Sequence, residues 1–254
     1  MVGCSIPAIF LPRLDDGLVT EARKTNAIRG DAFMERHFSG RVLDIGCGDD
    51  PVVPHARRFD RQDGDANRIL DHLAPAQFDC VHSSHCLEHM SDVPAALAQW
   101  WALVRPGGVL VLVVPHEDLY EQGVWPSLFN SDHKASFRLD SLASWSPVSH
   151  ELRTLLSALS DAAIEEIAVQ DHGYDHGLRR PIGAWGRRLY ALGSWRSAVM
   201  RRLFGGGAAV GWADRLLTRL EQRLGRPVAQ TDGAALAQIQ AVVRKTAASG
   251  PPAA

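Results

Sequence analysis

From residue 41 onward the chain alternates short apolar runs with segments of helical periodicity. The apolar runs have the length and near-continuous hydrophobicity of strands buried on both faces of a sheet. We expect five such strands: 41–45, 78–84, 109–114, 164–169 and 237–243. Between the second and third, residues 92–104 place apolar side chains at helical spacing and stop at a Pro-Gly-Gly turn. Strands that alternate with helices predict an α/β fold with a parallel sheet covered on both faces.

The two ends of the chain have patterns of their own. Residues 17–37 predict one leading helix that ends at Gly40. Residues 237–243 alternate polar and apolar side chains, which is typical of an antiparallel strand near the edge of a sheet. Residues 247–254 are expected to form a disordered tail.

Charge is distributed unevenly along the chain. The 27 basic and 29 acidic residues leave a net charge of −2, yet the stretch from His176 to Arg226 holds eleven arginines and two acids. A break in composition this sharp marks a separate structural unit. We expect five parts: an N-terminal helical segment (1–38), a core (39–171), a basic helical insertion (172–232), a final strand that completes the core (233–246) and the tail (247–254).

Composition excludes several classes of protein. No apolar run approaches the roughly 18–20 residues that a membrane-spanning helix needs. The four cysteines form no Cys-x-x-Cys pair, which argues against a disulfide framework. No basic segment precedes an apolar stretch at the N-terminus, so we expect a cytoplasmic protein.

The first chemical motif is Val42-Leu-Asp-Ile-Gly-Cys-Gly48, a strand that ends in Asp-x-Gly-x-Gly. Glycines at the carboxyl edge of a sheet let the backbone turn tightly and approach a ligand. A dinucleotide site would need a third glycine, and its pyrophosphate would be repelled by Asp49 and Asp50. The acidic loop therefore suits a cationic ligand better. Taken alone, the motif is also compatible with an ordinary glycine turn.

Four motifs in a fixed order carry a resemblance to a known family. The first is followed by Gly64-Asp-Ala66, Phe78-Asp-x-Val-x-Ser-Ser-His-x-Leu-Glu-His89 and Leu103-Val-Arg-Pro-Gly-Gly-x-Leu110. Together they resemble the class I S-adenosylmethionine-dependent methyltransferases from about residue 40 to 115, and more weakly beyond. The resemblance implies S-adenosylmethionine as cofactor. It also implies a Rossmann-like, mostly parallel sheet of seven strands with helices on both faces, with the arginine-rich helical insertion before the last strand.

The same resemblance implies a role for each residue at the ligand edge. Asp44 would face the amino group of the methionine moiety. Asp60, at the end of a short second strand, would bind the ribose hydroxyls, and Asp63 competes for this role because the first crossover helix must be very short. Asp65 would accept a hydrogen bond from the adenine amine. The floor beneath the sulfonium would be formed by Ser83, Ser84 and His85. The expected cofactor-binding residues are Asp44, Gly46, Cys47, Gly48, Asp60, Asp65, Ala66, Ser83, Ser84 and His85.

His85-Cys-Leu-Glu-His89 also matches a zinc-peptidase signature, His-x-x-Glu-His. In such peptidases both histidines lie on one helix and a third ligand follows. Here His85 directly ends a strand, and the next helix begins only at Asp92. We therefore expect Glu88 and His89 to fix the loop beneath the cofactor, and we expect no metal ion.

The methyl acceptor would lie against the loop that follows residue 114. This loop is rich in polar side chains, as a carbohydrate acceptor requires, although a solvated lid would have the same composition. A hydroxyl acceptor needs a general base, and we expect His116 or His133 in that role, together with Asp132. The segment Asn130-Ser-Asp-His-Lys-x-Ser-Phe137 is similar to methyltransferases of bacterial surface-polysaccharide and glycan synthesis. The resemblance implies O-methylation of a sugar or glycan, lipid-linked acceptors included.

The arginine-rich insertion predicts two amphipathic helices, residues 187–204 and 212–224. Arginines and tryptophans beside an apolar face suit a helix lying on an anionic membrane, which would make the protein peripheral to the inner membrane face. A helical cap over the active site or against another subunit is the alternative. No nucleic-acid-binding motif accompanies the arginines, so no nucleic acid partner is expected. A methyltransferase acting on RNA or another small molecule, and a non-catalytic binding module, are the other readings, and the oligomeric state is unknown.

Overall fold

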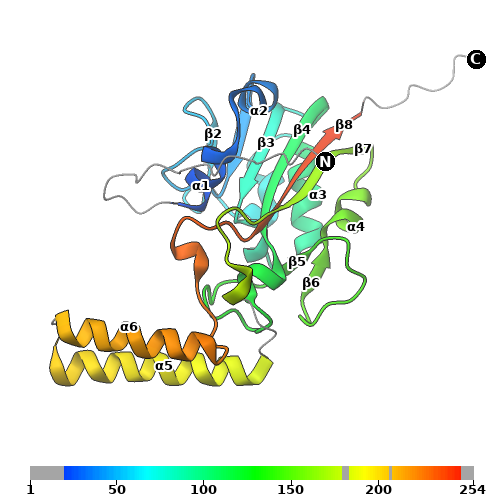
Figure 1. The fold of residues 1–254 in the computed structure, drawn as a ribbon. Helices are drawn as coiled ribbons and strands as arrows, with labels where there is room; N and C mark the ends of the chain where they lie inside the picture. The colour runs from blue at the N-terminus through cyan, green and yellow to red at the C-terminus, as the bar shows by residue number, and fades with distance from the viewer. Residues whose placement is uncertain (1–19, 179–182, 206–207, 247–254) are drawn as a thin grey trace, which may run out of the picture.

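The computed structural model describes residues 20–178, 183–205 and 208–246. Within these ranges, six strands form the main sheet in the order β2-β1-β3-β4-β8-β7. Strand β8 runs antiparallel to both of its neighbours, and the other five strands run parallel to one another. The fold is therefore Rossmann-like, with a mixed, mostly parallel sheet and helices against it, as the sequence predicts (Figure 1).

The main sheet consists of β1 (Val42–Ile45), β2 (Arg57–Phe59), β3 (Phe78–Ser84), β4 (Val104–Pro115), β7 (Ala162–Gln170) and β8 (Gln238–Lys245). Two further strands, β5 (Ser136–Arg138) and β6 (Ser149–Glu151), form a small parallel pair. The α-helices are α1 (Glu21–Ile28), α2 (Asp31–His37), α3 (Val93–Leu103), α4 (Leu152–Ser157), α5 (Gly183–Phe204) and α6 (Ala208–Arg223). Short 3-10 or π-helical turns are η1 (Ala66–Asp71), η2 (Leu87–His89), η3 (Glu117–Glu121), η4 (His176–Leu178) and η5 (Gln230–Asp232).

Alternating side chains of the strands build one apolar core on each face of the sheet. On one face, Leu43 and Leu110 pack with residues of η1, α3 and α4, among them the fully buried Trp100. On the opposite face, Val42 and Val111 pack with apolar residues of α2. Burial on both faces explains why these strands are nearly continuous apolar runs in the sequence. Because β1, β3 and β4 pair in parallel, their carboxyl ends lie at one edge of the sheet.

The leading helix predicted for residues 17–37 is instead two helices, α1 and α2. Gly30 has an extended backbone and begins α2, while Arg29 leaves the helical path at the end of α1. The Arg29 guanidinium reaches the buried face of the sheet, where its Nε donates to Gln240 Oε1 at 2.9 Å. Burial lowers the pKa of Arg29 to about 10. The part of this prediction before residue 20 and the predicted tail 247–254 lie outside the described residues.

Strand β8 is antiparallel, as predicted, but it lies inside the sheet and not near its edge, where β7 lies. The polar side chains that suggested a solvent-facing edge are buried: Gln238 contacts Thr25, and Gln240 contacts Arg29. The sheet has six strands within the described residues, whereas the resemblance implied seven. Between β2 and β3, residues 60–77 form turns and η1 with no further strand. The crossover from β1 to β2, for which a very short helix is predicted, contains turns and no helix.

Helices α5 and α6 form a long hairpin, which we call the basic hairpin (residues 183–223). The two helices lie side by side beyond the end of the sheet at which β4 ends and β8 begins (Figure 1). The hairpin confirms that the arginine-rich stretch is helical, and the five-part division of the chain stays a prediction. Over the described ranges, no helix combines the length and hydrophobicity that spanning a bilayer requires.

Candidate functional site

The carboxyl ends of β1, β2 and β3 form the edge at which the sequence motifs meet. Gly46 and Gly48 follow β1 with positive φ angles of 76° and 56°. A Cβ on Gly46 would lie 2.5 Å from Cys86 Sγ, so only glycine allows the chain after β1 to pass this close to the chain after β3. A Cβ on Gly48 would meet no atom within 4 Å, because this residue borders open space. Gly46 therefore allows a close approach of two chain segments, whereas Gly48 borders open space at the edge of the sheet.

Two adjoining cavities lie at this edge, and Gly46 and His85 line both of them. The larger, which we call the nucleoside cavity, has a volume of about 630 Å³. Its lining residues are Gly46, Phe59, Asp60, Arg61, Gly64, Asp65, Ala66, Asn67, His85, Cys86, His89, Met90, Asp132 and Lys134. The smaller, the amino-acid cavity, has a volume of about 290 Å³. Its lining residues are Thr20, Glu21, Ala22, Asp44, Gly46, Cys47, Gly48, Asp50, His82, Ser84 and His85.

Asp60 and Asp65 border the nucleoside cavity from two different turns. Asp60 follows β2, and its Oδ2 accepts a hydrogen bond of 2.7 Å from the Gly48 amide. Asp63, its competitor, lines neither cavity and accepts from the Asp60 amide at 2.9 Å, so it shapes the turn. Asp65 begins η1, and the hydrogen bonds that it accepts from Asn67 lower the pKa of its carboxyl group. The structure thus brings the carboxylates of Asp60 and Asp65 to the wall of one cavity.

Asp44 lies behind the ligand edge more than at it. Its side chain is 2% exposed, and both carboxylate oxygens accept hydrogen bonds, from the Val52 amide at 2.6 Å and from His82 Nδ1 at 2.6 Å. Arg29 Nη1 lies 3.3 Å from His82 Nε2, so this nitrogen is the acceptor and Nδ1 carries the proton. Burial is the main reason that the pKa of His82 is lowered. Asp44 therefore holds the loop after β1 in place by hydrogen bonds, and it forms part of the wall of the amino-acid cavity.

Glu21 is the acidic group that faces the amino-acid cavity with spare bonding capacity. Its Oε1 accepts from Lys24 Nζ at 2.6 Å, whereas its buried Oε2 accepts no hydrogen bond from the described residues. The buried Ser84 Oγ, on the wall of the same cavity, has no such partner either. Buried polar atoms are normally paired. Two unpaired oxygens in one cavity point to a ligand that donates hydrogen bonds there.

These residues fit S-adenosylmethionine. Its ammonium and sulfonium groups are cationic, its ribose hydroxyls and adenine amine are donors, and the walls offer Glu21, Asp60 and Asp65 as acceptors. Both cavities together are within the size range of about 300–1,000 Å³ typical of small-molecule sites. Nine of the ten predicted cofactor-binding residues line one cavity or the other. The tenth, Ser83, points away, and its Oγ donates to the Ile45 carbonyl at 3.1 Å.

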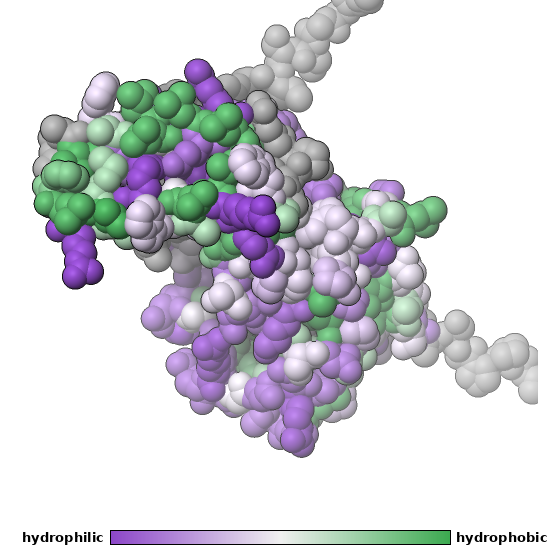
Figure 2. Space-filling view, turned by 90° about the horizontal axis from the view of Figure 1, so that it is seen from below, coloured by the Kyte–Doolittle hydropathy of each residue, from purple (hydrophilic) through white to green (hydrophobic). Residues whose placement is uncertain are grey.

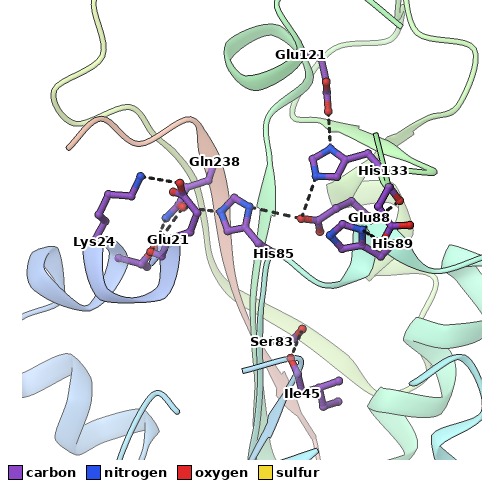
Figure 3. A network of polar contacts seen from close by, with 12 residues as sticks. Glu21, Lys24, Ile45, Ser83, His85, Glu88, His89, Glu121, His133 and Gln238 are labelled. Carbon is purple, nitrogen blue, oxygen red and sulfur yellow. Dashed lines mark hydrogen bonds and ion pairs between the residues drawn. The ribbon is translucent and has the colours of Figure 1, made fainter. Parts of the chain in front are cut away.

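His85 sits where the two cavities join and has an unusual backbone. Its φ of 52° lies in the left-handed region, a conformation that costs a non-glycine residue about 1 kcal/mol or more and that is concentrated at functional sites. Its ring lies between Gln238 Oε1, 3.0 Å from Nε2, and Glu88 Oε1, 3.5 Å from Nδ1 (Figure 3). Burial lowers the pKa of His85, but the contact with Glu88 outweighs it, so the pKa is raised overall.

The three predicted catalytic residues have different positions. Asp132 lines the nucleoside cavity, and its Oδ2 lies 3.2 Å from His89 Nδ1 and 3.2 Å from Arg61 Nη2. His133 is buried behind this wall, with Nδ1 2.7 Å from Glu121 Oε1. His116 begins η3, where its Nδ1 accepts from the Asp118 amide at 3.1 Å, and it lines neither cavity. Only Asp132 of the three borders the cavity.

Sequence reasoning missed Glu21 and underrated His89. Glu21 lies some 25 residues before the glycine motif in an unremarkable amphipathic segment, so no local signal marks it. His89 was expected only to fix a loop. It does so, since η2 is a 3-10 turn rather than part of a long helix, but its ring also lines the nucleoside cavity. The available signal was the position of His89 in a short segment between the end of one strand and the start of the next helix.

Comparison with known proteins gives one family. The sequence profile described as a methyltransferase domain matches residues 21–147, which is half of the chain and includes Glu21, both glycines and the loop with Asp132. No curated protein matches the chain.

Several solved structures resemble the chain at low sequence identity. The YcgJ protein from Bacillus subtilis is 14% identical, with a TM-score of 0.44 over 83% of this chain and 93% of its own. A SAM-dependent methyltransferase from Archaeoglobus fulgidus is 16% identical, with a TM-score of 0.43 over 85% and 92%. Coclaurine N-methyltransferase bound to N-methylheliamine and SAH is 13% identical, with a TM-score of 0.41 over 85% and 69%. None of these likenesses identifies the acceptor of this chain.

Proposed function

Because the chain belongs to the methyltransferase domain family and is an S-adenosylmethionine-dependent methyltransferase, we propose that it methylates a hydroxyl group of a sugar or glycan. The observation that carries this proposal is the polar wall of the nucleoside cavity beyond the cofactor residues, where Asp132, His89 and Lys134 lie together. A sugar offers several hydroxyl donors and acceptors to such side chains. An amine acceptor would need little more than positioning.

The chain's own residues would hold the donor at both of its ends. S-adenosylmethionine would supply an electrophilic methyl group on a sulfonium. Glu21 Oε2 would bind the ammonium group, Asp60 would accept from the ribose hydroxyls, and Asp65 would accept from the adenine amine. Gly46 and Gly48 leave room for the donor against the backbone. Fixing a reactant at several points converts binding energy into alignment, which contributes several kcal/mol to methyl transfer.

The proton of the acceptor hydroxyl needs a destination. Asp132 is the predicted catalytic residue that lines the cavity, and a carboxylate oxygen there can take this proton. The Arg61 and His89 contacts, both 3.2 Å from Asp132 Oδ2, hold the carboxylate in place. His133 lies behind Asp132 and supports the wall. A carboxylate is a weak base for an alcohol, so a second group must make the hydroxyl more acidic.

A transfer assay tests this function. Labelled S-adenosylmethionine and a panel of nucleotide-linked and lipid-linked sugars should give one or more methylated sugars, with the label on oxygen. Asp132→Asn should slow the transfer by about 10²–10⁴-fold and leave donor affinity unchanged, as expected for loss of a proton acceptor. Methylation of an amine, with every sugar inert, would contradict the proposal.

We further propose that the basic hairpin brings the enzyme to an anionic membrane surface, where a lipid-linked sugar would be presented. The apolar side chains of α5 and α6 face outward: Trp195 is 67% exposed, Phe204 68% and Trp212 62%. Figure 2 views the molecule from the hairpin side, where apolar surface is concentrated over these helices. Arginines on the same helices complement anionic lipid headgroups. Exposed tryptophans beside arginines favour an interfacial location.

Vesicle flotation tests the membrane proposal. The protein should float with phosphatidylcholine vesicles that contain phosphatidylglycerol, less with pure phosphatidylcholine, and still less in high salt. The variant Trp185→Ala/Trp195→Ala/Trp212→Ala should lose flotation and keep its affinity for S-adenosylmethionine. Leu142→Ala, which removes an exposed apolar side chain outside the hairpin, is the matched control and should float normally. Failure of the wild-type protein to float, or retention by RNA in place of vesicles, would overturn the proposal.

A further inference from the structure

A buried cluster of one carboxylate and two imidazoles lies beside the nucleoside cavity. Glu88, His89 and His133 each offer one ligand atom, and these atoms lie within 4.8 Å of one another. Glu88 and His89 come from η2, directly after β3, whereas His133 comes from the loop before β5. Figure 3 shows the side chains of the cluster turned toward one another. Two backbone hydrogen bonds from residues 134 and 135 to the Glu88 carbonyl, of 2.8 and 3.1 Å, join the two segments.

The Glu88 carboxylate has only long contacts with its neighbours. Its side chain is 0% exposed, and neither carboxylate oxygen accepts a hydrogen bond from the described residues. The nearest cationic candidates are His85 Nδ1 at 3.5 Å and His133 Nε2 at 3.9 Å. A buried carboxylate is normally held by hydrogen bonds, and these imidazole contacts are longer than hydrogen bonds. A metal ion between Glu88 and the imidazoles of His89 and His133 would supply the close partner that both oxygens of Glu88 lack among the described residues.

The hydrogen bonds behind the cluster prepare its nitrogens for a metal ion. His133 Nδ1 donates to Glu121 Oε1 at 2.7 Å. His133 Nε2, on the side of Glu88, therefore carries a lone pair. His89 Nδ1 lies 3.1 Å from the Asp132 carbonyl, which orients this ring in the same way. A carboxylate or carbonyl that accepts from the outer nitrogen of a histidine is the usual support of a metal ligand. Hydrogen bonds thus leave one nitrogen of each ring available for a metal.

We propose that Glu88, His89 and His133 bind a divalent transition-metal ion, such as Zn²⁺ or Mn²⁺, with an open coordination position toward the nucleoside cavity. Two imidazoles and one carboxylate suit these ions better than Mg²⁺ or Ca²⁺, which prefer oxygen ligands. His89 lines the cavity, so an open position on the ion would face this cavity. This inference departs from the expectation of a metal-free site. That expectation concerned a helical peptidase motif, and His133 was not part of it.

The ion would complete the proposed O-methyl transfer, on which this role rests. A divalent ion that binds the acceptor hydroxyl lowers the pKa of that hydroxyl, as it lowers the pKa of bound water. Asp132, which lines the same cavity, can then take the released proton. The metal would therefore supply the acidity that a carboxylate base requires, and it would orient the acceptor at the same time.

Metal titration tests the site directly. After treatment with a chelator, the wild-type protein should bind one equivalent of Zn²⁺ or Mn²⁺ in calorimetry, with elemental analysis confirming the stoichiometry. Glu88→Gln and His133→Ala should abolish this binding. Glu121→Gln, which removes only the support of His133, should weaken it by about 10–100-fold. His176→Asn, which alters an exposed histidine outside the cluster, should bind as the wild type does.

Two further measurements keep the result clear of folding defects and of the proposed function. Co²⁺ bound to the unmodified protein should give visible ligand-field bands and paramagnetic shifts of the His89 and His133 ring protons. Chelated protein should still bind S-adenosylmethionine yet transfer no methyl group. If the wild type binds no equivalent of metal, or if the ring protons of both histidines are unshifted by Co²⁺, the site does not exist. Loss of donor binding in the metal-loaded protein would count against the methyltransferase function instead.

Discussion

The sheet and the basic hairpin differ in where their apolar side chains lie. The sheet buries apolar side chains between helices and leaves polar groups at the strand ends, where the cavities are. In the hairpin, the contact between α5 and α6 is polar: Arg196 Nε lies 2.9 Å from Glu221 Oε1, and its Nη1 lies 2.5 Å from Asp214 Oδ1. The tryptophans and most leucines of the hairpin are exposed.

This difference separates what stabilises each region from what each region does. Burial of apolar area is the dominant stabilising term in folding, and the sheet has such burial on both of its faces. A helix pair whose apolar side chains face outward is stabilised by its ion pairs and stays ready to cover those side chains on another surface. The two helices of the hairpin also pack closely: a Cβ on Gly193 would lie 2.4 Å from Glu221 Oε2. Glycine at position 193 therefore allows α5 to approach the polar side chains of α6.

The largest effect is expected on the free energy of unfolding, when one tryptophan from each region is replaced by alanine. Trp100 is fully buried under the sheet and donates to the Ala66 carbonyl at 2.9 Å. Trp100→Ala should lower the free energy of unfolding by about 3–5 kcal/mol, because it opens a cavity. Trp195→Ala should change it by less than about 0.5 kcal/mol, as for other exposed positions. Urea titration followed by circular dichroism measures both, and similar losses for the two variants would erase the contrast.

A smaller effect is expected from the polar interface of the hairpin. Arg196→Ala removes the partner of two carboxylates and should destabilise the hairpin by about 1–2 kcal/mol, a value reduced because these groups are partly exposed. Hydrogen exchange should become faster in residues 183–223 and stay unchanged in β1, β3 and β4. Arg215→Ala, at an exposed arginine of α6, is the control. Faster exchange in the sheet as well would show that the two regions unfold together.

Acid should open the hairpin by the same route. The hydrogen bond from Ser197, aided by Arg196, lowers the pKa of Asp214. Burial raises the pKa of Glu221, but Arg196 and Arg226 outweigh it, so this pKa is lowered too. Depressed carboxyl pKa values stabilise the fold above the unfolded-state values of about 4, and this stabilisation is lost as the pH falls through the folded-state values.

Protection factors, corrected for the intrinsic exchange rate, should therefore fall in the hairpin below about pH 4. Glu221→Gln should flatten this pH dependence. Protection that stays constant down to pH 3, or that falls equally in Glu221→Gln, would mean that the ion pairs do not hold the hairpin together.

Local pattern was sufficient for most of the fold. The strands at 78–84 and 109–114 and the helix before the second of them are long, uniform signals, and the structure has each of them. The break between α1 and α2 was not visible, because Arg29 leaves the helix for a buried contact with β8, some 210 residues away. The prediction that β8 lies near the edge of the sheet was wrong for the same reason: Gln238 and Gln240 of β8 face Thr25 and Arg29, and not water.

Site residues that directly follow a strand could be predicted from the sequence. Site residues that come from helices and loops far away in the sequence could not be placed with one another. Gly46, Gly48 and Asp60 follow strands whose ends must share an edge, so their positions follow from topology. Glu21 reaches the same edge from a helix before the first strand, a path that no periodicity encodes. His133 was predicted near the acceptor, but its grouping with Glu88 and His89 depends on the path of a loop. The Glu88 cluster is the clearest case, since two ligands are adjacent in sequence and the third is 44 residues farther along.

Binding of S-adenosylmethionine, measured by calorimetry, is the most direct test of the cavity at the sheet edge. We expect one equivalent to bind the wild-type protein, with Asp60→Ala weakening the affinity about ten- to hundredfold through loss of charge-assisted hydrogen bonds. Glu21→Gln should weaken it about tenfold, because the ammonium group loses its anionic partner. Absence of binding to the folded wild-type protein, or equal affinity in all three proteins, would contradict the assignment of these two cavities to the methyl donor.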